Sequence, residues 1–112
     1  MVETKNAAIS KAEIFIEDHG YLTAFLYLDY GGTSKGFGGY NIGCTGANYA
    51  GLFIRKCLET VGVSNWDSLR GKTIRVKAER GKVHEIGHII QDKWFNPSEE
   101  IKRIEAAEVV SP

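Results

Sequence analysis

Cysteine and net charge are both scarce in this chain of 112 residues. Its two cysteines, Cys44 and Cys57, are too few for a disulfide framework and are not spaced as a CxxC pair. The 14 Lys and Arg residues are balanced by 14 Asp and Glu, so no basic excess points to a nucleic acid polymer. We expect free thiols in a reducing compartment and no polymeric nucleic acid partner.

Long apolar runs are also missing. No segment of about 18 consecutive apolar residues occurs, so we expect no transmembrane helix and no membrane partner. Met1–Ala8 is polar and lacks the apolar run behind a basic start that marks a signal peptide. These features predict a cytoplasmic protein.

Length and patterning predict one α+β domain over residues 1–112, with an ordered core from about residue 8 to 107 and a loose start over residues 1–6. Alternating side chains predict strands over Ala8–Glu17, Tyr21–Tyr30, Gly36–Ile42, Lys72–Glu79 and Lys82–Ile90. Helical spacing predicts one helix over Asn48–Val61, ended by Gly62, and a second that is capped by Asn96 and runs to about Ala107. The expected architecture is an antiparallel β-sheet of about five strands with two helices.

The predicted strand Tyr21–Tyr30 is apolar or amphipathic on both faces. One face carries Leu22, Ala24, Leu26 and Leu28, and the other carries Tyr21, Thr23, Phe25 and Tyr27. We expect a central strand that is covered on both sides. Together with Trp94 and Phe95, this strand offers surface for a homo-oligomer.

Glycine is concentrated in Gly31–Gly46, which holds seven of the 13 glycines. One interpretation is that these glycines leave room for a neighbouring element. The other is a pocket wall at which backbone N–H groups, Phe37 and Tyr40 meet a ligand. The sequence leaves both interpretations open.

Several side chains suit a ligand that carries phosphates and a base. Arginines form bidentate bonds to phosphates, to which Lys35 would add a further positive charge. Aromatic rings stack on a base, and an asparagine reads its edge. The candidate ligand-binding residues are Phe37, Tyr40, Asn41, Arg55, Arg75 and Arg80. This set favours a binding module over an enzyme, and we expect no catalytic residue, no cofactor and no metal.

His84, Glu85 and His88 match the HExxH pattern of zinc hydrolases. In that motif the two histidines share one zinc because they lie one turn apart on a helix. On a strand they would lie about 13 Å apart and could not bind the same ion. The alternation of Lys72–Glu79 and the Arg80-Gly81 turn favour a strand, and a small zinc hydrolase is kept as an alternative.

Four segments in order resemble a family of small phage and prophage proteins. They are EDHGYLTAFLYLDYGG (17–32), GFGGY (36–40), GVSNWDSLRGKTIRV (62–76) and IGHIIQDKWFNP (86–97). The pattern covers about residues 9 to 97 and does not include Glu85, which agrees with a strand at HEIGH.

Among phage proteins of this size, the functional match is the Thoeris anti-defence sponge family. Its members sequester a glycocyclic ADP-ribose signal made by a TIR-domain enzyme without cleaving it, in oligomers whose pockets use arginines, an aromatic and an asparagine. The resemblance implies an anti-defence protein in the cytoplasm of the infected bacterial cell that binds a cyclic nucleotide-type signal, either glycocyclic ADP-ribose or a cyclic oligonucleotide. The family's pocket residues do not align position by position, so the candidate residues above rest on chemistry. The alternative is a phage inhibitor that acts by direct protein–protein contact, as anti-CRISPR proteins do.

Overall fold

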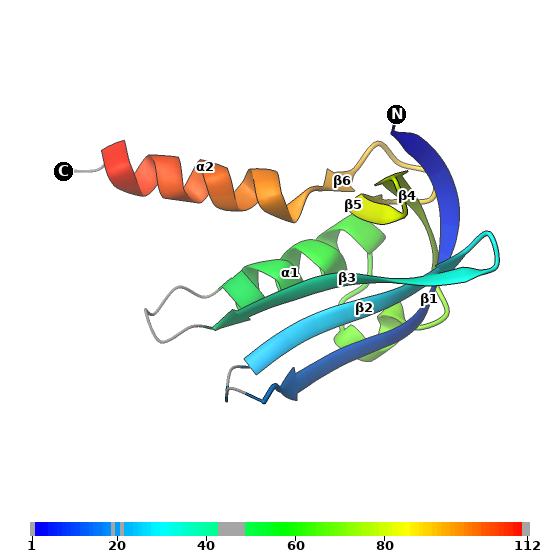
Figure 1. The fold of residues 1–112 in the computed structure, drawn as a ribbon, viewed down its shortest axis with the longest axis horizontal. Helices are drawn as coiled ribbons and strands as arrows, with labels where there is room; N and C mark the ends of the chain where they lie inside the picture. Colours follow the sequence, from blue (N-terminus) through cyan, green and yellow to red (C-terminus); the bar gives the residue numbers. More distant parts are fainter. Residues whose placement is uncertain (1, 19, 21, 43–48, 111–112) are drawn as a thin grey trace.

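The computed structural model describes residues 2–18, 20, 22–42 and 49–110 (Figure 1). Within these residues, six strands form one antiparallel sheet in the order β3-β2-β1-β4-β5-β6. The strands are β1 (Glu3–Ile16), β2 (Leu22–Tyr30), β3 (Thr33–Ile42), β4 (Thr73–Glu79), β5 (Lys82–Gly87) and β6 (Trp94–Phe95). The predicted α+β domain with an antiparallel sheet and two helices is confirmed.

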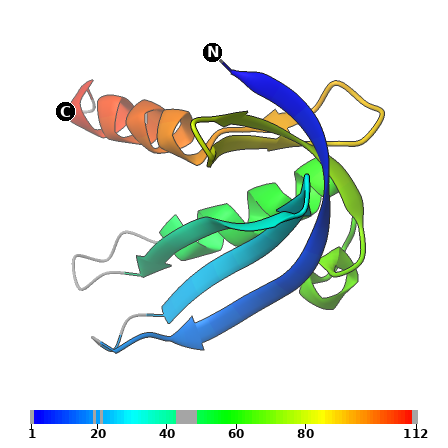
Figure 2. The same ribbon diagram turned by 45° about the vertical axis from the view of Figure 1, so that its right-hand side comes forward.

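Helix α1 (Tyr49–Val61) lies between the two halves of the curved sheet (Figures 1 and 2). Its Phe53 and Cys57 are fully buried, whereas Arg55 and Glu59 face outward. Gly62, with φ 89°, ends the helix, and its N–H donates to the Leu58 carbonyl at 2.9 Å. The predicted start at Asn48 lies outside the described residues.

Helix α2 (Pro97–Val110) follows β6 and extends away from the sheet (Figure 1). Its start is capped as predicted, because Asn96 Oδ1 accepts from the Glu99 N–H at 3.1 Å. A short 3-10 turn, Trp66–Leu69, connects α1 to β4 and buries Leu69. No helix in the described ranges is long and apolar enough to cross a membrane.

The expectation of a loose start over residues 1–6 is wrong, because β1 begins at Glu3. Residues Glu3–Ala8 pair with β4, and Ala8–Ile16 pair with β2. The first four residues of β1 are exposed and polar, so no apolar alternation marks them as a strand. Their strand conformation comes from backbone pairing with β4, a partner about 70 residues away in sequence.

The predicted strand Lys82–Ile90 is also too long, since β5 ends at Gly87 and a loop over residues 88–93 leads to β6. His88 organises this loop, because its Nδ1 accepts from the N–H groups of Ile90 and Gln91 at 3.0 and 2.9 Å. Arg75 of β4 donates to the carbonyls of His88 and Gln91, at 2.7 Å each. These bonds replace the ladder that a longer strand would form.

Two glycines of β3 allow close packing, which confirms the first interpretation of the glycine-rich stretch at these positions. A Cβ added to Gly36 would lie 2.5 Å from the Phe25 ring. Gly38 has φ 124°, and a Cβ there would lie 2.8 Å from both Phe53 Cζ and the Ala24 carbonyl oxygen. Only glycine fits such a site without displacing α1 or β2.

We therefore predict that Gly38→Ala lowers the free energy of unfolding by about 2–4 kcal/mol, because it adds both a steric clash and backbone strain. Urea denaturation followed by circular dichroism measures this loss. Ser34→Ala, at an exposed position of the same strand, is the control and should change stability by less than about 0.5 kcal/mol. Equal stability of the two variants would contradict the close packing at Gly38.

Candidate functional site

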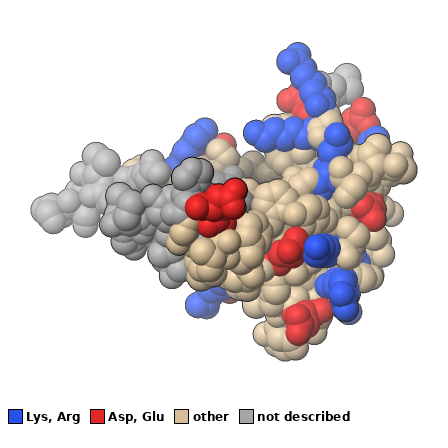
Figure 3. Space-filling view, turned by 60° about the horizontal axis from the view of Figure 1, so that its bottom comes forward, with Lys and Arg blue, Asp and Glu red and all other residues tan. Residues whose placement is uncertain are grey.

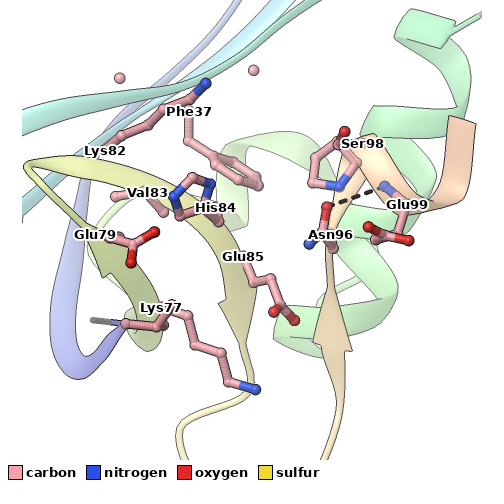
Figure 4. A pocket seen from close by; sticks show the side chains of 14 residues that line it. Phe37, Lys77, Glu79, Lys82, Val83, His84, Glu85, Asn96, Ser98 and Glu99 are labelled. Carbon is pink, nitrogen blue, oxygen red and sulfur yellow. Dashed lines mark hydrogen bonds between the residues drawn. The ribbon is translucent and has the colours of Figure 1, made fainter. Parts of the chain in front are cut away.

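A cavity of about 660 Å³ opens between β3, the β4–β5 hairpin and the start of α2 (Figure 4). Its wall is made by Gly36–Gly38 of β3, Lys77 and Glu79 of β4, residues 82–85 of β5, and residues 96–99 around the start of α2. These segments are distant in sequence and meet because the curved sheet brings β3 close to β5. Gly36–Gly38 thus line a cavity, and the ligand contact that the second interpretation of the glycine-rich stretch requires stays a prediction.

Register shifts lie in both hairpins that border the cavity. In β5, Glu85 pairs with Lys77 and Val83 pairs with Ala78, so His84 is the extra residue of a bulge. In β3, the pairing shifts between Tyr40 and Gly38, opposite Ala24 and Phe25. Bulges re-aim side chains next to functional sites, and here one bulge places His84 at the cavity wall.

The cavity carries charges of both signs. Lys77 and Lys82 line it together with the carboxylates of Glu79, Glu85 and Glu99. Lys77 is partly engaged, since its ammonium lies 4.3 Å from the centre of the Trp94 ring. On the face shown in Figure 3, acidic and basic side chains are interspersed and several Lys and Arg side chains gather at the upper end. The chain therefore has local charge clusters despite its zero net charge.

The start of α2 forms a fixed wall of the cavity. Asn96 accepts hydrogen bonds from two backbone N–H groups of the first turn. Its side-chain oxygen accepts from the Glu99 N–H and its carbonyl accepts from the Glu100 N–H, both at 3.1 Å. Pro97 has no N–H to offer. This helix terminus therefore contributes shape and side chains to the site more than free backbone donors.

Of the predicted ligand-binding residues, Phe37 lies at the cavity. It is only 4% exposed and packs on Phe53 and Phe95 at centroid distances of 5.5 and 6.2 Å. Phe37 is thus a floor residue that belongs to the core, and its ring faces are not open for stacking. Tyr40 and Asn41 lie in β3 opposite Ala24 and Thr23, and their side chains are outside the described part of the structure.

The three predicted arginines lie apart from the cavity wall. Arg55 is exposed on α1 and pairs with Glu59 at 3.1 Å. Arg75 holds the loop over residues 88–93 and lies 4.8 Å from the centre of the Trp94 ring. Arg80 sits in the turn between β4 and β5. The structure does not bring these three together.

The HEIGH segment is extended, as the alternation predicted. His84 and Glu85 are in β5, and His88 lies beyond its end with Nδ1 committed to two backbone N–H groups. The helix that the zinc-hydrolase motif requires is not formed here. Across the described ranges, no group of three or more His, Cys, Asp or Glu side chains is placed to hold a metal ion.

Sequence reasoning missed Lys77, Lys82, Glu79 and Glu99 as wall residues. Charged side chains at alternate positions of a hairpin are typical of a face that is exposed to solvent. The alternation does not indicate which other segment of the chain lies near that face. Only the curvature of the sheet and the position of α2 turn that face into a cavity.

Comparison with protein-family models, curated proteins and solved structures finds no match to this chain. The four-segment resemblance therefore stays a prediction.

Cys57 is enclosed in the core, and burial raises the pKa of its thiol well above the usual range. The thiolate is therefore not formed near neutral pH, and we predict that Cys57 does not react with a thiol reagent such as DTNB in the folded protein. In a Cys44→Ser variant, Cys57 is the one remaining thiol, so the reagent reports on Cys57 alone. In denaturant this thiol should react fully. Stoichiometric labelling of the folded variant at pH 8 would contradict this burial.

Proposed function

We propose that this chain is a phage-encoded anti-defence protein that binds a cyclic nucleotide-type immune signal and sequesters it without cleavage. The signal class is glycocyclic ADP-ribose or a cyclic oligonucleotide. The observation that carries the proposal is the cavity of about 660 Å³, a size within the usual range for small-molecule sites. Two of the four segments of the phage-family resemblance contribute to its wall, through Gly36–Gly38 and Asn96–Pro97.

The mixed polarity of the wall suits a sugar nucleotide better than a bare polyanion. Lys82 and Lys77 offer donors to phosphate oxygens, and His84 offers a ring nitrogen. Carboxylates such as Glu85 only accept hydrogen bonds when ionised, which matches the hydroxyl pairs of ribose. The edge of Phe37 and the side chain of Val83 give an apolar floor for a base.

Sequestration needs affinity and stoichiometric capture, and no catalytic group. Under this proposal the protein acts in the cytoplasm of the infected bacterial cell, without a cofactor, at a concentration comparable with that of the signal. Small size and assembly into a homo-oligomer serve such a role, because each subunit supplies one wall or one whole site.

Exposed apolar side chains at the end of the β1–β2 hairpin support the homo-oligomer. Ile14 and Ile16 lie on the face of the sheet that carries Ala24 and Leu22, yet they are 43% and 65% exposed. Phe15, on the opposite face, is 38% exposed. A second copy that covers this end would bury all three. The same surface favours the second candidate function, inhibition of a host protein by direct contact.

Native mass spectrometry with cyclic dinucleotides, cyclic trinucleotides and cyclic ADP-ribose isomers tests the proposed function. We expect one of these ligands to be retained with its mass unchanged. Lys82→Ala and His84→Ala should each weaken binding about tenfold, the loss expected for one hydrogen bond to a charged group. Lys72→Ala, which removes an exposed lysine outside the cavity wall, is the control.

Cleavage of a bound ligand would refute sequestration. A protein that retains none of these ligands would refute the signal class and favour a protein target. One zinc per chain, lost in His84→Ala, would instead revive the hydrolase alternative.

For the oligomer, we predict that Ile16→Asp lowers the molecular mass measured by light scattering, because it places a charge in the interface. Ile90→Asp is the matched control, since Ile90 is 83% exposed in the loop before β6. An unchanged mass in Ile16→Asp would exclude this hairpin end as the interface.

A further inference from the structure

A smaller hollow of about 240 Å³ lies where three parts of the sheet meet: the start of β1, the β2–β3 turn and the β4–β5 turn. It is separate from the cavity described above. Glu79 and Lys82 of the β4–β5 hairpin line the cavity, whereas Arg80 and Gly81 at its tip line the hollow. The polar side chains that line it are Glu3, Lys5, Tyr30, Thr33, Lys35 and Arg80.

Cations dominate this hollow. Lys5, Lys35 and Arg80 line it against one carboxylate, Glu3, which pairs with Lys5 at 3.3 Å. Lys35 reaches across to the β4–β5 turn, since a Cβ built on Gly81 would lie 3.4 Å from its Nζ atom. An excess of positive charge thus gathers here in a chain whose net charge is zero.

Tyr30, one of the residues that line the hollow, has an unusual hydroxyl group. It is buried, and it has no hydrogen-bond partner within the described part of the chain. Buried polar groups are normally satisfied, so an unpartnered phenol at a cationic hollow marks a place for an acceptor. The ammonium of Lys5 lies 5.8 Å from the centre of the same ring. An anionic oxygen would satisfy the phenol and neutralise the cations together.

The backbone of Arg80 has a positive φ angle, which is uncommon for a residue other than glycine. Arg80 and Gly81 have φ of 54° and 78°, and their flanking residues Glu79 and Lys82 pair directly. Two positive φ angles define a type I′ hairpin turn, in which asparagine is favoured at the first position and arginine is not. An arginine at this strained position is explained if its side chain has a task.

We propose that this hollow is a second ligand site, which takes the phosphate group of a small phosphorylated molecule through Arg80, Lys35 and the Tyr30 hydroxyl. Guanidinium and ammonium groups are the usual partners of phosphate. The volume admits a phosphate with a sugar-sized fragment, and the chain lacks the basic excess that accompanies binding to a nucleic acid polymer. This site goes beyond the proposed function and does not depend on it.

Calorimetric titration with inorganic phosphate, at constant ionic strength set by KCl, tests the site. The wild-type protein should bind phosphate saturably. Arg80→Asn should weaken binding about tenfold or more, because it removes a charged donor, while the melting temperature without phosphate stays equal or rises. Tyr30→Phe should weaken binding at an unchanged fold. Arg70→Asn, at an exposed position outside the hollow, should leave binding unchanged.

Four outcomes would overturn the proposal. They are no saturable binding to the wild-type protein, equal losses in Arg80→Asn and Arg70→Asn, a lower melting temperature in Arg80→Asn with phosphate binding intact, and affinity for an oligonucleotide that rises with its length. Arg80→Asn separates the two sites, since it should weaken phosphate binding at the hollow while the wall of the cavity keeps all of its side chains.

Discussion

The shared strand β1 is the constraint on which the rest of the structure depends. Its first half pairs with β4, its second half pairs with β2, and the two halves meet near Ala8 within one sheet. Ile9 fixes this point, because its N–H donates to the Lys72 carbonyl at 2.9 Å and its carbonyl accepts from the Gly71 N–H at 2.8 Å. The register shift that follows Ile9 lets the strand bend, so the sheet curves around α1.

An aromatic cluster joins the two halves of the curved sheet. Phe53 of α1 lies between Phe37 of β3 and Phe95 of β6, at centroid distances of 5.5 and 5.9 Å. Phe37 also forms part of the cavity floor. The floor of the cavity is therefore part of the packed core. The short β6 and the loop held by Arg75 belong to the same arrangement, because they set where α2 begins.

The β4–β5 hairpin lies between the cavity and the smaller hollow, which differ in the charged side chains that line them. On one side, carboxylates and lysines share a large cavity with a bulged histidine, His84. At its tip, Arg80 and Lys35 gather beside the unpartnered Tyr30 hydroxyl. In both places the electrostatic field comes from the charged side chains that lie nearby, since the charges of the whole chain cancel.

The elements that depend on local interactions could be predicted from the sequence. Alternation predicted β4 and the start of β5, Gly62 predicted the end of α1, and Asn96 predicted the start of α2, because each acts through neighbouring residues. Three other features depend on contacts between distant parts of the chain. The polar residues Glu3–Asn6 form a strand, Arg75 holds a loop, and lysines and glutamates of one hairpin line a cavity. The reason is physical: backbone ladders form without regard to side-chain pattern, and the curvature of a sheet places distant residues together without leaving a periodic trace in the sequence.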